Sequence, residues 1–235
     1  MTDLEKIERE LKSHENKPQA AILRRFFKTA PGEYGAGDVF FGLKVPLQRR
    51  IAMKYRDLNL TGVKALLKSK IHEFRLVGLL ILVEQYTVAK EEKTKKSLVS
   101  FYLKNTKTIN NWDLVDLSVY KILGDWFLPR DKSILFKLAE SKNLWERRMA
   151  MVATFAFIRA GRTKETFLIA KKLLKDEHDL IHKAVGWMLR EAGKRTGEKN
   201  LEGFLARYYR QMPRTALRYA IERLPQKRRE YYLKK

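Results

Sequence analysis

The spacing of helical patterns along the chain is the feature that most constrains its fold. Apolar residues recur with helical periodicity from about residue 46 onward, and no alternating strand pattern of useful length occurs. The helices come in pairs, and the first helix of successive pairs is expected near residues 72, 112, 144, 179 and 214. A period of about 30–40 residues is typical of helical-hairpin repeats, which stack into a curved solenoid with a concave surface. We therefore predict an all-α solenoid that forms a single domain over residues 1–235.

Local signals place the helix ends. Thr2 and Glu5 form a capping box, Pro18 suits the first turn of a second helix, and Thr61 is expected to cap a short helix. Residues 30–45 are rich in glycine and break the periodicity, so they predict a packed loop. The helices are expected at residues 4–13, 18–27, 46–52, 61–67, 72–86, 94–103, 112–127, 131–139, 144–160, 164–174, 179–192 (ending at Gly193), 198–209, 215–224 and 226–233.

The charge balance points to a polyanionic partner. Lys and Arg number 50 against 27 Asp and Glu, which gives a net charge of +23. A hydrophobic core does not require this excess, and the excess destabilises the compact state through self-repulsion. Nucleic acid is the first candidate partner, because each neutralised phosphate releases counterions. An anionic membrane surface and ribosomal RNA are the next candidates, and a generally basic proteome or a solubility effect is the plain alternative.

Several other classes are disfavoured. Cysteine is absent, which excludes disulfides and thiolate metal sites. The longest apolar run, Leu76–Val83, is too short to span a bilayer, and the N-terminus lacks a signal-peptide pattern. His178 and His182 are four residues apart, but the pattern fixes no third metal ligand. We expect a cytoplasmic monomer, associated with the nucleoid when it acts on DNA, with no metal, no cofactor and no membrane partner.

The segment around Trp112 carries the most distinctive chemistry. Asn111 is placed to cap a helix by accepting a backbone N–H two or three residues on, and Asp113 falls in the first turn, where the helix dipole favours negative charge. Trp112 and Asp116 are four residues apart and share one helix face. An indole beside a carboxylate suits a cationic ligand.

Two later repeats place further aromatic and basic residues near the start of their first helices. One offers Trp145, Arg147 and Arg148, and the other offers Lys183, Trp187 and Arg190. Repeat stacking would bring these residues to one side. The structural alternatives are that each tryptophan belongs to the core, and that Asp116 pairs with Arg148 between adjacent repeats. Arg49, Arg50 and Arg147 have the further alternative of being simply solvated.

At these residues the sequence resembles the AlkD-type DNA alkylation repair glycosylases. The resemblance rests on the segments Trp112–Asp116, Asn143–Arg148, Lys183–Glu191 and Gly42–Arg49, which occur in the family's order and cover most of the chain. It implies a right-handed superhelical solenoid of HEAT-like repeats that binds duplex DNA in its concave groove. It also implies hydrolytic excision of cationic alkylpurines, such as 3-methyladenine and 7-methylguanine, without base flipping.

The resemblance also assigns roles to residues. Asp116 matches the catalytic aspartate, Trp112 and Trp187 match two active-site tryptophans, and Arg148 matches the active-site arginine. The DNA-binding residues expected in the groove are Arg190, Lys183, Arg147, Arg49, Arg50 and Phe26.

The chain departs from the family in two places. Phe26 stands where the family can have tyrosine, which removes a hydroxyl, and the glycine-rich stretch at residues 31–41 is longer than expected. Some relatives lack the carboxylate and bind DNA without excision. Two alternatives to an enzyme therefore stay open beside it. One is a non-catalytic protein that binds bent or branched DNA, and the other is a helical-repeat scaffold that binds proteins.

Overall fold

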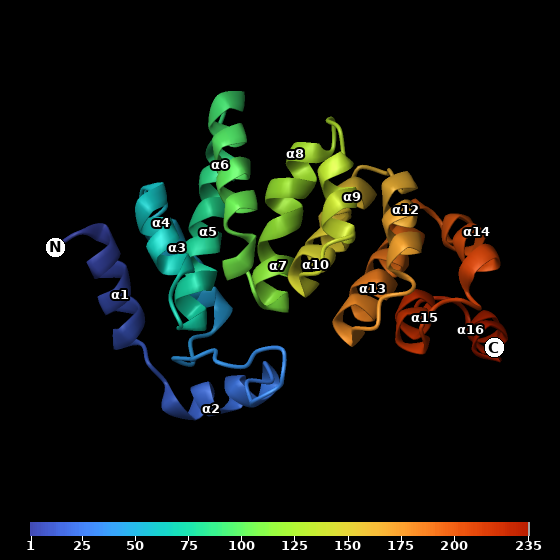
Figure 1. The fold of residues 1–235 in the computed structure, drawn as a ribbon, viewed down its shortest axis with the longest axis horizontal. Helices are drawn as coiled ribbons and strands as arrows, with labels where there is room; N and C mark the ends of the chain where they lie inside the picture. The colour runs from blue at the N-terminus through green and yellow to red at the C-terminus, as the bar shows by residue number, and fades with distance from the viewer. Residues whose placement is uncertain (235) are drawn as a thin grey trace. The chain divides into compact units, whose positions relative to one another are not determined.

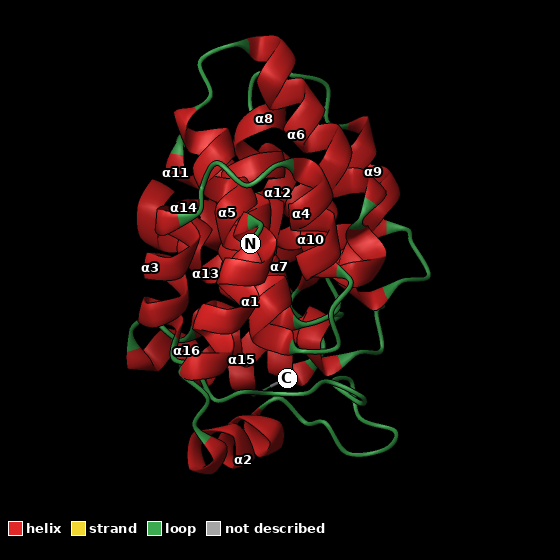
Figure 2. Ribbon diagram, turned by 90° about the vertical axis from the view of Figure 1, so that its left-hand side faces the viewer, coloured by secondary structure: helices red, strands yellow, loops and turns green. Residues whose placement is uncertain are grey.

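The computed structural model describes residues 1–234 and is all-helical over them, which confirms the predicted all-α class. The solenoid arrangement stays a prediction. Loops join the helices, as Figure 2 shows, and the only strand-like pairing in the described part is an isolated bridge between Val39 and Ile71. None of the described helices is both long and apolar enough to cross a membrane. The chain forms two compact units, Met1–Ser118 and the part from Val119 onward. The prediction of one domain over the whole chain stays a prediction.

The N-terminal unit is built around the apolar helix α5 (His72–Val88), against which α3 (Val45–Lys54) and α4 (Leu60–Leu67) pack. The predicted apolar run Leu76–Val83 is buried along its whole length. Helix α2 (Lys17–Phe26) lies beyond one end of α5 in both ribbon views, with the glycine-rich loop beside it (Figures 1 and 2). The other helices of this unit are α1 (Asp3–Ser13), α6 (Glu92–Lys104), the 3-10 turn η1 (Thr106–Thr108) and α7 (Trp112–Val119).

The C-terminal unit centres on α13 (Asp179–Thr196), which packs against α10 (Leu144–Ala153), α12 (Lys164–Leu173), α14 (Glu198–Tyr208) and α15 (Arg214–Ile221). It begins with a turn of π-helix, η2 (Tyr120–Gly124), that continues α7 into α8 (Asp125–Phe127). Its remaining helices are α9 (Ser133–Ala139), α11 (Phe155–Arg159) and α16 (Gln226–Leu233).

Most predicted helix starts are confirmed. Helices begin at His72, Trp112, Leu144, Asp179 and Arg214, as the repeat spacing predicts. The capping box of Thr2 and Glu5 is present, and Pro18 lies in the first turn of α2. These signals are local, so they do not depend on how the helices pack.

Three predictions about helix ends and continuity are wrong. Asn59 rather than Thr61 caps α4, with its Oδ1 accepting the N–H of Gly62 at 2.9 Å. The expected helix 144–160 is interrupted at Thr154. The expected helix 112–127 has the predicted ends and includes one turn of π-helix.

The third concerns Gly193, which does not end α13. Gly193 is buried, and a Cβ atom added to it would lie 2.9 Å from Leu201 Cδ2. Glycine therefore allows α13 to pack closely against Leu201. The helix instead ends at Gly197, which has a φ of 102°.

Candidate functional site

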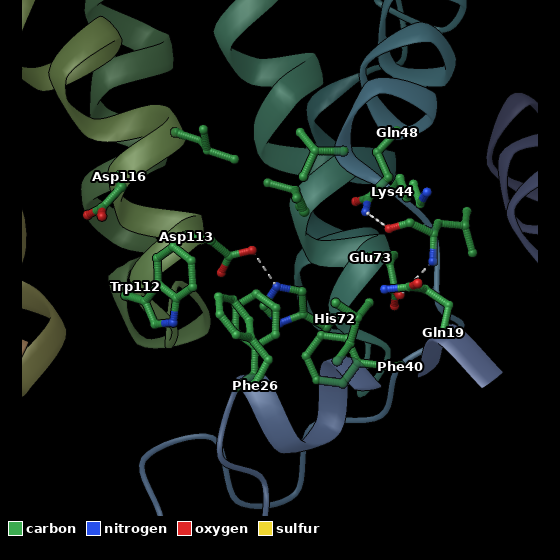
Figure 3. Close-up of a pocket in the computed structure, with 16 residues that line it drawn as sticks. Gln19, Phe26, Phe40, Lys44, Gln48, His72, Glu73, Trp112, Asp113 and Asp116 are labelled. Atoms are coloured by element: carbon green, nitrogen blue, oxygen red, sulfur yellow. Dashed lines mark hydrogen bonds and ion pairs between the residues drawn. The ribbon is translucent and has the colours of Figure 1, made fainter. Parts of the chain in front are cut away.

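A cavity of about 370 Å³ opens in the N-terminal unit between α2, α3, α5 and α7. Trp112 and Asp116 both line it, and so does Phe26 (Figure 3). Three residues chosen from the sequence therefore border one cavity. The volume falls within the range of about 300–1,000 Å³ that is usual for small-molecule sites.

One wall of this cavity is a cluster of aromatic rings. Trp112 stacks on Phe27 with centroids 5.1 Å apart and an interplanar angle of 15°, and Phe27 stacks on Phe40 at 5.0 Å. Phe26 meets Trp112 edge to face at 5.7 Å and remains 61% exposed. Phe27 and Phe40 are buried and hold the half-buried Trp112 in a fixed plane. The indole is thus an ordered surface for a ligand.

The two aspartates of α7 play different parts. Asp113 is buried, and its carboxylate points toward His72, whereas that of Asp116 points away from His72 (Figure 3). Asp116 is half-buried and lines the cavity together with Trp112. Asn111 Oδ1 accepts the N–H of Trp112 at 2.8 Å, one residue on rather than the two or three expected. Of the two carboxylates, Asp116 is the one that the sequence assigned to chemistry.

Behind the aromatic wall lies a buried charge network that the sequence did not predict. His72 Nε2 lies 2.8 Å from Asp113 Oδ2, and His72 Nδ1 lies 3.1 Å from Asp38 Oδ2. Arg75 binds the other oxygen of Asp38 at 2.7 Å, and the amide of Asn111 donates to Asp38 at 3.2 Å. The network ties the glycine-rich loop to the first turns of α5 and α7.

The network changes the protonation of its members. Burial alone would lower the pKa of His72, but the charge of Asp113 and hydrogen bonds to Asp113 and Asp38 raise the pKa to about 9. Burial alone would raise the pKa of Asp38, but the His72 hydrogen bond and the charge of Arg75 bring it below its ordinary value. His72 is therefore an imidazolium held between two carboxylates at neutral pH.

A third buried carboxylate, that of Glu73, holds the loop at the cavity's edge. Glu73 Oε1 accepts the N–H groups of Gly42 and Leu43 at 2.8 and 3.2 Å, and Oε2 accepts that of Phe41 at 3.1 Å. Gly42 has a φ of 85°, and a Cβ atom there would lie 2.2 Å from the carbonyl oxygen of Asn16. Glycine is therefore required where the loop crosses the start of α2.

The predicted basic residues of the N-terminal unit lie on α3. Arg49 is partly exposed and Arg50 is exposed, so both are accessible to a phosphate. Their role in DNA binding stays a prediction.

Arg147 and Arg148, both on α10, have protein partners in the C-terminal unit. Arg148 is buried and donates to the carbonyl of Leu180 at 2.6 Å, which ties α10 to α13. Arg147 binds Asp176 at 2.5 Å through Nε and donates from Nη1 to the carbonyls of Ser141 and Lys142, both at 3.0 Å. These contacts give both arginines a structural task beside the predicted one.

The three predicted residues of α13 are partly exposed. Lys183 pairs with Asp179 at 2.7 Å, and Arg190 pairs with Glu222 of the segment after α15. Trp187 lies against Phe155 with ring centroids 6.1 Å apart. The predicted union of Trp187 and Arg148 with Trp112 and Asp116 in one site stays a prediction.

Sequence reasoning missed Phe27, Phe40, Asp38 and His72 as parts of this site. The pairs Asp38–His72 and His72–Asp113 are 34 and 41 residues apart, so no local spacing indicates them. The adjacent rings Phe26 and Phe27 at the end of α2 were the available signal, and both line the cavity.

Comparisons with known proteins identify the family and the fold of the chain. The family model described as DNA alkylation repair enzyme matches residues 7–224. The structure is similar, with a TM-score of 0.70 and 18% sequence identity, to a solved structure described as a predicted DNA alkylation repair enzyme from Enterococcus faecalis, and the match covers 91% of this chain and 98% of that one. At this identity the structural likeness shows a common fold. No curated protein sequence matches the chain. Because the family model spans nearly the whole chain, the chain belongs to the DNA alkylation repair enzyme family.

Proposed function

We propose that this protein is a monofunctional DNA glycosylase that excises cationic N-alkylated purines, such as 3-methyladenine and 7-methylguanine, from duplex DNA. The observation that carries the proposal is the joint placement of Trp112 and Asp116 on one aromatic cavity of a protein with a net charge of +23. Family membership supports a role in alkylation repair. The regular helix-pair spacing supports a right-handed HEAT-like solenoid that carries the DNA.

The chemistry requires little from the protein. An alkylated purine is positively charged, so the electron pair of the breaking N-glycosidic bond moves onto the base, which leaves neutral and needs no general acid. Positive charge develops on the deoxyribose, where the fixed carboxylate of Asp116 would stabilise it. A water molecule attacks C1′ and loses a proton, and Asp116 is placed to orient it. The products are the free base and an abasic site.

Aromatic and basic residues would support this reaction. The indoles of Trp112 and Trp187 offer faces to a cationic base or sugar, and such contacts contribute about 0.5–2 kcal/mol each. Exposed arginines such as Arg50 would bind the phosphates. Arg148 would be the active-site arginine. The proposed place of action is the DNA of the nucleoid.

The test is release of methylated base from alkylated duplex DNA. Asp116→Asn keeps the size of the side chain and removes its charge, so release is expected to fall about 100-fold or more while DNA affinity is kept. Asp57→Asn is the matched control, because its side chain is 96% exposed and lies in the same unit. If Asp116→Asn releases base at the wild-type rate, Asp116 does not have this role.

A non-catalytic DNA-binding protein is the second candidate, and the charge of +23 favours it. It predicts salt-sensitive binding with a preference for bent or branched DNA and no base release above background. Preference for junctions over alkylated duplex, with no release, would select this function over the first.

A further inference from the structure

The cavity of the N-terminal unit is larger than the space that the carboxylate of Asp116 needs in order to approach a sugar. Asp116 and Trp112 occupy one side of it, whereas Gln19, Lys44 and Gln48 line the other side (Figure 3). The space between them is bounded by aromatic rings and aliphatic side chains. A volume of about 370 Å³ is enough for a planar bicyclic ring.

The shape of the wall suits a flat ring. Trp112, Phe27 and Phe40 stack on one another with interplanar angles of 15° and 21° between neighbours, and Phe40 also stacks on His72. Phe27 and Phe40 are buried, so the half-buried Trp112 at the end of the stack is the ring with a face left for a ligand. Phe26 stands edge-on to Trp112 and is 61% exposed, although it is a large apolar side chain. Aromatic faces bind nucleobases by stacking, at about 1–3 kcal/mol per base.

A buried polar atom on the side of the cavity opposite Trp112 lacks a partner. Gln48 is 2% exposed, and its Nε2 donates to the carbonyl of Leu43 at 2.8 Å. Its Oε1 has no hydrogen-bond partner in the part of the chain that the structure describes. A buried acceptor without a donor is costly, and a ring N–H or exocyclic amine would satisfy it after a small shift of the amide. Purines carry such donors on the same plane that stacks.

The charges in and around the cavity favour a purine ring inside it and the phosphates of the nucleotide outside it. The charged residues that line the cavity are the carboxylates Glu73, Asp113 and Asp116 and the cations Lys44 and His72, which leaves an excess of one negative charge. A neutral or cationic ring is therefore favoured inside the cavity over an anionic phosphate. Arg24, Arg25 and Lys28 flank Phe26 in sequence and are exposed. Basic residues interleaved with aromatic ones are typical of sites that hold an unstacked base and its phosphates.

We propose that this cavity binds a single purine ring separated from the base stack, with Trp112, held in place by Phe27 and Phe40, as the stacking surface and Gln48 Oε1 as a hydrogen-bond acceptor. The ring has two possible sources, namely a nucleotide turned out of the duplex or the free base after excision. The inference rests on the proposed function in one respect, namely that the ligand is a purine. The family resemblance implies excision without base flipping. Binding of the free base after excision agrees with this, and binding of a nucleotide turned out of the duplex does not.

Two variants and one control test the cavity. Leu23 lines the cavity and is partly buried, so Leu23→Trp fills it, while Gln48→Met removes the acceptor at nearly constant size. Leu168→Trp is the matched control, since Leu168 is 43% exposed on α12 in the other unit. Thermal unfolding of each full-length variant shows whether it folds, and Gln48→Met keeps the test valid if Leu23→Trp does not.

The first arm measures binding of free bases without DNA. Calorimetric titration with 3-methyladenine, 7-methylguanine and cytosine is expected to show saturable binding of the purines. Affinity is expected to fall about tenfold or more in Leu23→Trp and Gln48→Met, which is about 1.4 kcal/mol, and to be unchanged in Leu168→Trp. This result identifies the free base as a ligand.

The second arm uses undamaged duplex DNA with one unpaired purine. Because an unpaired base is cheaper to unstack, wild type is expected to bind it about tenfold more tightly than matched duplex if a turned-out nucleotide enters the cavity. Leu23→Trp should lose this preference and Leu168→Trp should keep it.

Binding that survives in both cavity variants, or no binding in either arm, overturns the proposal. Neither arm measures excision. A wild type that releases methylated base but fails both arms retains the proposed function and refutes the cavity, and the reverse result refutes only the function.

Discussion

His72 Nε2 lies 2.8 Å from Oδ2 of Asp113, the residue between Trp112 and the rest of α7. The imidazole also stacks on Phe40 with centroids 4.6 Å apart. One buried side chain thus holds both the helix that carries Asp116 and the ring wall of the cavity. The position of the candidate carboxylate therefore depends on a charge pair that lies outside the reacting groups.

This pair predicts a pH dependence of stability. The pKa of His72 is raised from 6.5 to about 9, so its contribution is complete below pH 6.5 and is lost as the pH rises toward 9. The loss is expected to reach at most about 3 kcal/mol. Urea unfolding between these pH values should show the decline, and His72→Gln should flatten it. An equal decline in the variant would assign it to other groups.

Asp113 and Asp116 should differ in what they stabilise. Asp113→Asn removes a buried partner of an imidazolium, so the free energy of unfolding is expected to fall by about 3 kcal/mol. Asp116→Asn, on the half-buried cavity side, should cost less than about 1 kcal/mol. Denaturant titration of both variants measures this, and equal losses would contradict the separation of their roles.

Gly42→Ala should destabilise the N-terminal unit more than Gly37→Ala. Both residues have positive φ, 85° and 86°, so both variants pay backbone strain of about 1–2 kcal/mol. Only at Gly42 would the new methyl also meet backbone, at 2.2 Å from Asn16 O and 2.6 Å from Ala20 N, whereas nothing lies within 4 Å at Gly37. Differential scanning calorimetry should rank the two variants in this order. Equal melting temperatures would mean that the loop yields.

The two kinds of predicted DNA-binding arginine should separate in salt titrations. Arg50 is exposed, so Arg50→Ala is expected to reduce the slope of log K against log salt by about one unit. Arg147 is held by Asp176 and two carbonyls, so Arg147→Ala should mainly lower the melting temperature. If Arg147→Ala reduces the salt slope and leaves the melting temperature unchanged, Arg147 binds DNA instead of serving mainly in stability.

The sequence predicted what is local. Helix starts such as His72 and Trp112 follow from periodicity and caps, which act within a few residues, and these starts agree with the structure. The face shared by Trp112 and Asp116 also follows from helix geometry, and both residues line one cavity. Family membership agrees with the motifs that first indicated it.

What could not be predicted depends on long-range packing. The cavity wall needs Phe40, which the glycine-rich loop brings beside α5, and no period relates that loop to α7. Glycines were ambiguous for the same reason. Gly193 and Gly197 look alike as helix ends, but Gly193 is fixed by contact with Leu201, which only the fold supplies.

Gly186 lies within a matching family segment, and its neighbours explain why a glycine is there. A Cβ atom would lie 2.4 Å from Tyr219 Cβ and 2.5 Å from Ala216 O, so α13 and α15 approach closely at this point. Gly186→Ala is expected to cost about 1–3 kcal/mol and to shift α13, which carries Trp187 and Arg190.

Gly203→Ala is the matched control for Gly186→Ala. Gly203 lies inside α14 with nothing within 4 Å of its added methyl, so the variant should gain about 0.5–1 kcal/mol from helix propensity. Thermal unfolding of both variants gives opposite signs if packing decides at Gly186. If Gly186→Ala is also stabilised, α15 moves aside at no cost, and the close approach of the two helices does not explain the glycine.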